Sequence, residues 1–171
     1  MRVRRIRADE ADRVRDLRLR ALADPVAEIA FLDTLENATA QPEDFWQARA
    51  RRAAAGDEAA QFVAVAEDDE WFGTATVLVT DERRALRTAL VVGVYVAEGH
   101  RGEGTVDALL DACAAWATDR GFAELVLEVH VDNARASAAY ERCGFVRTGE
   151  ITELANGHEH VMTRPLHPVV G

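Results

Sequence analysis

The stretch from Val91 to Phe145 constrains the fold of this chain more than any other. It opens with an apolar run, VVGVYV, followed by a glycine-bearing segment, GHRGEG, and an amphipathic run, TVDALL. A second apolar run, LVLEVHV, leads through Asn133 into another amphipathic segment. Each half is typical of a strand followed by a helix. Because free backbone amides at a helix N-terminus bind phosphates, the glycine segment predicts a phosphate-binding turn.

The rest of the chain alternates between helical and strand periodicity, which predicts a mixed α/β domain. Helices are expected from the cap Asp9 to Asp24, from Pro42 to about Gly56, over residues 105–120, and from the cap Asn133 to Gly144. Strands are expected at residues 3–6, 61–67, 71–80, 88–96, 125–131, 147–154 and 158–164. Between Pro25 and Pro42 we expect helical turns and mobile loop, and DERRALR is expected to be a charged connection.

Length and composition fit one globular domain spanning residues 1–171. A hydrophobic fraction of 49% and a charged fraction of 29% are ordinary for a soluble protein. No apolar run approaches the roughly 20 residues that cross a bilayer, and the basic N-terminus lacks the apolar region of an export signal. We therefore expect a cytoplasmic protein with no membrane partner, with Cys113 and Cys143 as buried reduced thiols.

The charge balance is acidic, with 30 acidic residues, 20 basic residues and a formal net charge of -10. A protein that binds nucleic acid or an anionic membrane would instead present a basic face, so neither is expected as a partner. The acidity suits a cationic small molecule or peptide as substrate, but solubility alone is the simpler explanation.

Two nucleotide-binding motifs do not fit the glycine segment. A dinucleotide fingerprint aligned on Gly102 and Gly104 requires a glycine at Asp107, and a P-loop requires a G-K-[ST] triplet that the chain lacks. A nucleotide-binding module is therefore disfavoured, while a purely structural tight turn stays open on these residues alone.

Two longer motifs identify a family. The signature R/Q-x-x-G-x-G/A lies over Arg101 to Val106, and N-x-x-A-x-x-x-Y-E-x-x-G-F lies over Asn133 to Phe145. With these motifs at this separation and in this order of elements, the chain resembles the GNAT superfamily of N-acetyltransferases. The resemblance implies a mixed, mostly antiparallel sheet of about seven strands with helices on both faces, acetyl-coenzyme A as co-substrate, and no metal.

The resemblance also implies which residues bind coenzyme A. The pantetheine arm pairs with the main chain of the strand before the turn, the turn amides hold the pyrophosphate, and the second helix contacts the arm. The implied residues are Val94, Tyr95, Val96, Arg101, Gly102, Gly104, Thr105, Val106, Asn133, Ala136 and Tyr140.

The chain departs from the family pattern at two positions. Val106 stands where the signature prefers glycine or alanine, and Glu98 stands where proline is frequent. Because backbone amides do the binding, we expect weaker or slightly displaced coenzyme A rather than none. Glu103 adds mild repulsion beside the phosphates, which Arg101 is expected to offset.

Two residues are candidates for proton transfer. Tyr140 matches the family position that protonates the leaving sulfur, and a phenol keeps its proton at neutral pH. Glu128 is the candidate general base, twelve residues before Tyr140 as in ribosomal-protein alanine acetyltransferases, which share the L-x-L-E-V pattern. Because the pKa of an ordinary glutamate is about 4.3, this role needs burial or a water relay. A solvated carboxylate that attracts a cationic acceptor stays open.

The resulting hypothesis is direct acetyl transfer to a primary amine of a small molecule or peptide within a ternary complex. A peptide N-terminus, a polyamine, an amino acid and an aminoglycoside-like drug are not separated, and a homodimer is left open. The alternative is a non-catalytic acyl-coenzyme A binding or regulatory domain of the same fold.

Other residues have structural interpretations. His100 is expected to pack on the turn, and His158 and His160 lack a third metal ligand. Phe31, Phe45 and Trp46 are expected to line the acceptor pocket or the core.

Overall fold

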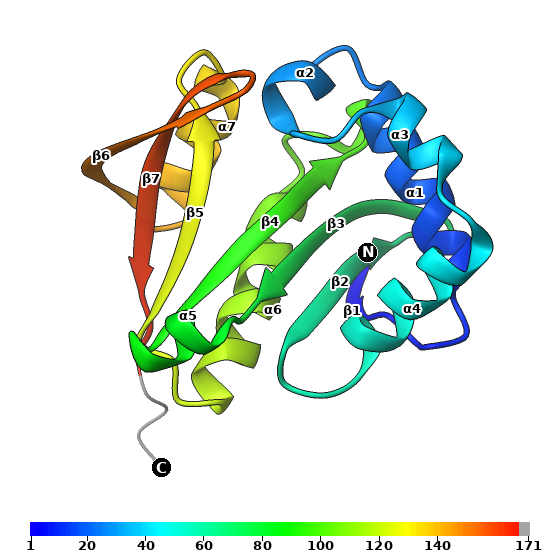
Figure 1. Cartoon of the computed structure of the whole chain (residues 1–171), viewed down its shortest axis with the longest axis horizontal. Helices are drawn as coiled ribbons and strands as arrows, with labels where there is room; N and C mark the ends of the chain where they lie inside the picture. Colours follow the sequence, from blue (N-terminus) through cyan, green and yellow to red (C-terminus); the bar gives the residue numbers. More distant parts are fainter. Residues whose placement is uncertain (168–171) are drawn as a thin grey trace.

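The computed structural model describes residues 1–167 apart from the side chain of Glu28, and its centre is a seven-stranded sheet (Figure 1). The strand order is β1-β2-β3-β4-β5-β7-β6. All neighbouring strands are antiparallel except β4 and β5, which run parallel. The predicted mixed and mostly antiparallel sheet is therefore confirmed.

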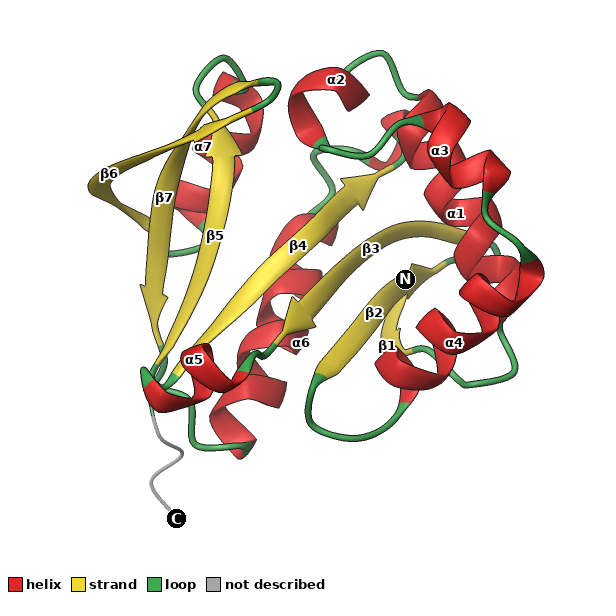
Figure 2. Cartoon of the chain, viewed as in Figure 1, coloured by secondary structure: helices red, strands yellow, loops and turns green. Residues whose placement is uncertain are grey.

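The elements follow the expected order closely (Figure 2). The strands are β1 (Arg2–Arg5), β2 (Ala59–Val65), β3 (Trp71–Leu78), β4 (Thr88–Val96), β5 (Glu124–His130), β6 (Val146–Leu154) and β7 (Gly157–Pro165). The helices are α1 (Ala11–Ala23), α2 (Ala27–Ala30), α3 (Leu35–Ala40), α4 (Glu43–Ala54), α5 (Asp81–Ala85), α6 (Thr105–Asp119) and α7 (Ala134–Arg142), with a 3₁₀ turn at Glu98–His100.

Local differences from the sequence-based expectation occur at helix ends and in one connection. Asp9 is not the cap of the first helix, because α1 begins at Ala11 and Glu10 occupies the cap position. The charged connection contains the short helix α5, whose cap Thr80 accepts a hydrogen bond from the amide of Arg83. The cap at Asn133 is confirmed, since its side chain accepts from the amide of Ala136.

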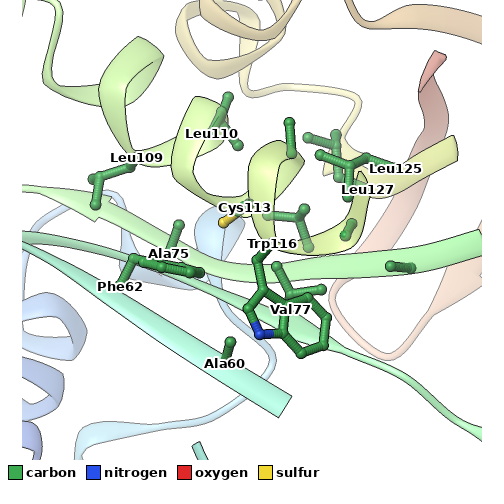
Figure 3. Packing of buried hydrophobic residues seen from close by; sticks show 14 of the residues in the cluster. Ala60, Phe62, Ala75, Val77, Leu109, Leu110, Cys113, Trp116, Leu125 and Leu127 are labelled. Carbon is green, nitrogen blue, oxygen red and sulfur yellow. The ribbon is translucent and has the colours of Figure 1, made fainter. Parts of the chain in front are cut away.

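Helices cover both faces of the sheet, as expected. α6 packs on one face of β2, β3 and β4, and α1 and α4 pack on the other (Figure 3 shows the α6 side). Along β2 the side chains alternate, with Phe62 in the cluster beneath α6 and Val63 in the cluster beneath α1 and α4. Burial of a side chain such as Leu109 stabilises the folded chain by roughly 1.5–3 kcal/mol, so the two layers together stabilise the sheet.

A bulge in β4 shapes the centre of the sheet. Thr74 pairs with Tyr95 and Thr76 pairs with Val92, so two residues of β4 face one residue of β3. One of the two is Gly93, whose φ of 63° lies in the left-handed region that favours glycine. Because a bulge bends its strand, β4 pairs with β5 only over Thr88–Leu90 and then diverges from it (Figure 1).

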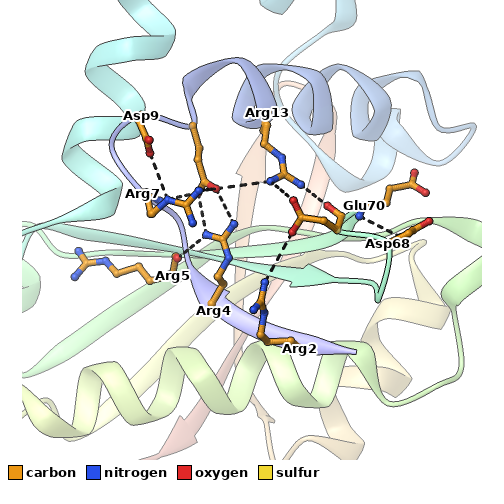
Figure 4. Close-up of polar contacts among 10 residues, drawn as sticks. Arg2, Arg4, Arg5, Arg7, Asp9, Arg13, Asp68 and Glu70 are labelled. Carbon is orange, nitrogen blue, oxygen red and sulfur yellow. Dashed lines mark hydrogen bonds and ion pairs between the residues drawn. The ribbon is translucent and has the colours of Figure 1, made fainter.

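An ionic cluster joins β1 to the start of α1 (Figure 4). The carboxylate of Glu10 is 4% exposed and accepts hydrogen bonds from Arg4 at 2.6 and 2.9 Å and from the amide of Arg7 at 2.8 Å. Burial alone would raise the pKa of Glu10. The hydrogen bonds and the nearby positive charges lower this pKa by more than burial raises it, so the net pKa lies below its usual range. The cluster therefore stabilises the folded chain at neutral pH.

We predict that Arg4→Met lowers the free energy of unfolding by about 3 kcal/mol, because it strips a buried carboxylate of its main partner. Since the folded pKa of Glu10 is depressed, this stabilisation is present above the unfolded pKa near ~4.3 and is lost as pH falls through the folded pKa. Urea unfolding at pH 7 measures the change. Arg2→Met is the control, because Arg2 is 68% exposed and lies 3.8 Å from Asp69. Equal effects of the two changes would contradict the prediction.

Candidate active site

A cavity of about 530 Å³ fills the space where β4 and β5 diverge. Its walls come from β4, the turn before α6, the end of β5, α7, and the segment around α2. Every residue that the sequence predicted for coenzyme A binding or catalysis lies on this lining. The fold therefore brings the two predicted strand–helix units to one space, while the role of each residue stays a prediction.

The glycine turn has the backbone that the sequence suggested. Gly102 and Gly104 have φ values of 82° and 79°, in the left-handed region, and Gly104 occupies the cap position of α6. An added Cβ at either glycine would have nothing within 4 Å, so a ligand has open access to the backbone there. The first amides of α6 have no partner within the helix and face this space, which suits an anion.

The start of α6 is seated tightly on β3. Thr105 is 2% exposed, and a Cβ added at Gly73 would come within 3.2 Å of its methyl group. Val106 is half-buried and packs against the core while also lining the cavity. The glycine at position 73 thus lets the helix N-terminus approach the sheet closely.

The side chain of Arg101 links the glycine turn to the end of β4 and to α1. Its guanidinium donates to the carbonyl of Val96 at 2.9 Å and to the carboxylate of Asp24, at the end of α1. Glu103 instead lies 3.6 Å from the imidazole of His100. No ion pair links Arg101 to Glu103 in residues 1–167, and the expectation that Arg101 offsets the repulsion of Glu103 on the phosphates stays a prediction. The importance of Asp24 was not predicted, because it depends on where α1 ends.

The aromatic residues divide as follows. His100 stacks on Phe72 of β3 with ring centroids 4.0 Å apart and also lines the cavity, so its contact is with the sheet rather than with the turn. Trp46 is buried in the core, and Phe45 is 39% exposed and lies off the cavity lining. Phe31 lines the cavity next to α2.

Tyr140 lies on α7 and faces the cavity from within the core. It is 9% exposed, and its ring packs against that of Phe145. Burial, with a smaller contribution from Cys143, raises the pKa of the Tyr140 phenol above its usual range. The group therefore holds its proton at neutral pH and suits a proton donor rather than a base.

Glu128 has a partner that sequence reasoning missed. In the register of β5 and β7, His130 pairs with Glu159 and Glu128 pairs with Val161, so the two glutamates are diagonal neighbours on one face. Their side chains share a hydrogen bond, and both line the cavity. Burial raises the pKa of Glu159, Glu128 raises it further, and His130 lowers it. In the sequence, the alternating run HEHV after the Asn-Gly turn places Glu159 on one face of a strand. This run does not show which residues of β5 lie opposite it, so the pairing with Glu128 could not be predicted.

The family comparison agrees with this geometry. Residues 23–145 match the model of the acetyltransferase (GNAT) family. The chain belongs to this family. Over 98 residues this GNAT chain is 34% identical to aminoglycoside N(6')-acetyltransferase type 1 of Stenotrophomonas maltophilia, covering 55% of the chain and 64% of that protein. The chain spans 26% to 64% of the length of the curated relatives that it matches.

Solved structures share the GNAT fold over nearly the whole chain. An acetyltransferase of the GNAT family from Streptococcus pneumoniae has a TM-score of 0.80 at 15% identity, covering 97% of this chain and 99% of its own. A phosphinothricin acetyltransferase from Sinorhizobium meliloti, solved in complex with AcCoA, has a TM-score of 0.73 at 19% identity, covering 99% and 94%. At these identities the likeness concerns the fold.

Residues 1–167 contain neither a candidate membrane-spanning helix nor a cluster of side chains placed to hold a metal ion. No helix in that part of the GNAT chain combines the length and apolar character needed to cross a membrane. No group of three or more His, Cys, Asp or Glu side chains in the same part is placed to hold a metal ion, and the expectation of no metal stays a prediction.

We predict that Glu128→Gln lowers the apparent pKa of Glu159 toward the ordinary value near ~4.3, because it removes a like charge next to that carboxylate. Carboxyl-carbon NMR titration of the folded protein measures the change. Glu124→Gln, on the same strand but opposite Pro165, is the control and should leave the pKa of Glu159 where it is. An unaltered titration in Glu128→Gln would show that the two carboxyls are not coupled.

Proposed function

We propose that this GNAT chain is an N-acetyltransferase that moves an acetyl group from acetyl-coenzyme A to a primary amine by direct transfer in a ternary complex. The observation that carries the proposal is the single cavity lined by the glycine turn, the bulged strand, a buried phenol and a carboxyl pair. A phosphate turn alone would fit a binding domain. The two kinds of proton-transfer group beside it favour an enzyme over the non-catalytic alternative.

The donor fits along β4. The ladder between β4 and β5 stops at Leu90, so main-chain groups of the remaining residues on that edge face the cavity. An amide-bearing arm can hydrogen-bond to such an edge as an added strand would. The pyrophosphate then meets the amides that follow Gly104. A main-chain amide near the bulge at Gly93 polarises the thioester carbonyl.

The proton balance assigns roles to the cavity side chains. The acceptor ammonium loses one proton before its nitrogen attacks the thioester carbon, and the pair Glu128–Glu159 takes it directly or through water. A carbon–nitrogen bond forms, the carbon–sulfur bond breaks, and the sulfur takes a proton from Tyr140. The nitrogen loses a second proton as the amide forms, and transfer of that proton to the Tyr140 phenolate restores the donor. The proton taken by the carboxyl pair is the one released overall. A carboxyl whose pKa is raised is a better base for this task than an isolated glutamate.

The acceptor is proposed to be a small molecule. The relative from Stenotrophomonas maltophilia is named for an aminoglycoside, which supports a small-molecule amine. A peptide N-terminus is the second candidate, since nothing in the cavity lining excludes it. A cytoplasmic location, the absence of nucleic-acid and membrane partners, and a homodimer stay at the level of expectations from the sequence.

A thiol-release assay with acetyl-coenzyme A and a panel of amines tests the proposal. We predict turnover with at least one amine, and a loss of roughly 10²–10⁴ in rate in Tyr140→Phe, because the variant removes the proton donor. Coenzyme A affinity should change little. Binding of coenzyme A without turnover on any amine would favour the non-catalytic alternative, and an unchanged rate in Tyr140→Phe would remove that residue from the mechanism.

We also predict that Gly104→Ala weakens coenzyme A binding, because it forces a side chain onto left-handed backbone where the pyrophosphate approaches. Gly56→Ala is a matched control, since Gly56 has the same φ of 79° and open surroundings but lies off the cavity lining. Both should cost about 1–2 kcal/mol of stability. Calorimetric titration with coenzyme A should detect weaker binding only for Gly104→Ala, and equal affinities would contradict the assignment of the turn.

A further inference from the structure

A second, smaller polar chamber lies on the other side of the β4 bulge, beneath α1 and α4. Its volume is about 20 Å³, enough for one or two waters. Gln61, Thr74 and Thr76 of β2 and β3 line it and are each less than 10% exposed. Two arginines complete it, Arg18 from α1 and Arg49 from α4.

The chamber carries an excess of positive charge. Arg18 lies 3.6 Å from Asp33, and its side chain is 16% exposed. Burial lowers the pKa of both guanidinium groups, and the charge of Arg18 adds to this effect at Arg49, while Asp33 opposes it. Two cations thus face one carboxylate. The buried Nε of Arg18 has no hydrogen-bond partner in the described part of the chain, and the same is true of the Nε of Arg4.

A purely structural role predicts a different arrangement. The pair Arg4–Glu10 shows how this chain holds a buried carboxylate, with two direct hydrogen bonds at 2.6 and 2.9 Å. Arg18 instead has a single looser ion-pair contact with Asp33. Burying an incompletely paired charge is costly, and a guanidinium is shaped to bind a carboxylate through two parallel hydrogen bonds. Because two guanidinium groups share one carboxylate here, their surplus positive charge points to an anionic ligand.

The chamber adjoins the cavity at the point where acetyl transfer is proposed. Gly93 lines both spaces, and a Cβ placed there would lie 3.9 Å from a terminal nitrogen of Arg18. The guanidinium of Arg18 also stacks over Phe31, 4.8 Å from the ring centroid, and Phe31 lines the cavity. An anion held by Arg18 would therefore lie beside the bulge, next to the cavity in which acetyl transfer is proposed.

We propose that Arg18, whose terminal nitrogen reaches the bulge at Gly93, binds a carboxylate of the acceptor from the cavity side, while the charge of Arg49 adds to the attraction. The substrate is then an amino-acid-like molecule with its amine close to a carboxylate. This inference rests on the proposed acetyltransferase function and names its substrate class. The net charge of the chain, -10, suggested a cationic acceptor. At contact distance, however, the local pair of arginines outweighs distant, screened surface charge. A polyamine or an aminoglycoside would place a second positive charge next to Arg18 and Arg49, which is unfavourable.

The test compares L-amino acids with their matched carboxamides, and with spermidine, in the thiol-release assay. We expect kcat/KM for the acid to exceed that for the amide by roughly 10- to 100-fold, the ratio that a charge-assisted hydrogen bond supplies. In Arg18→Gln this ratio should fall toward one. Arg15→Gln is the control on the same helix, because Arg15 is 45% exposed and its only ion-pair contact in residues 1–167 is with Asp16.

The outcomes separate this inference from the proposed function. Turnover that favours amides or spermidine, or a ratio unchanged in Arg18→Gln, would overturn the carboxylate site while leaving the acetyltransferase intact. Binding of coenzyme A with no turnover on any amine would overturn both. Should Arg18→Gln fail to fold, Arg49→Gln on the neighbouring helix provides the same measurement, and thermal unfolding of each variant identifies such a failure.

Discussion

The site depends on one constraint, the short pairing between the two parallel strands. β4 and β5 share a ladder over only three residues of each strand, because the bulge at Gly93 bends β4 away. If β4 and β5 paired along their whole length, the main-chain groups of residues 91–96 on that edge would be hydrogen-bonded to β5. Here it faces a cavity of about 530 Å³, and the two strand–helix units deliver their helix N-termini to the same opening. The geometry for binding a phosphate and an amide-bearing arm follows from that divergence.

Electrostatics within this frame is strongly local. The chain as a whole is acidic, yet the two faces of the β4 bulge differ in sign. The cavity side of β5 and β7 presents Glu128 and Glu159, and burial together with the neighbouring carboxyl of Glu128 raises the pKa of Glu159. The side beneath α1 and α4 presents Arg18 and Arg49 with one carboxylate between them. An acceptor with an amine at one end and a carboxylate at the other would meet a complementary group at each end.

Much of the fold could be predicted because its signals are local. β4 has the predicted bounds, the turn glycines have left-handed backbone, and Asn133 caps its helix. The error at the start of α1 has a tertiary cause. Asp9 was expected to cap α1, but Glu10 occupies that position and is drawn into an ionic cluster with Arg4. That choice depends on how β1 meets the helix, which no pattern within either segment records.

The sequence alone determined the family, the order of elements and the residues of the turn, because short-range periodicity, glycine conformation and motif spacing are written in consecutive residues. Only the tertiary structure decided which side chains meet. Glu159 joins Glu128 through the register of β5 and β7, Asp24 meets Arg101 where α1 ends, and Arg18 meets the bulge of β4. Each of these contacts joins segments far apart in the chain, and strand register and helix packing fix them through the burial of whole faces. No local signal in the sequence specifies them.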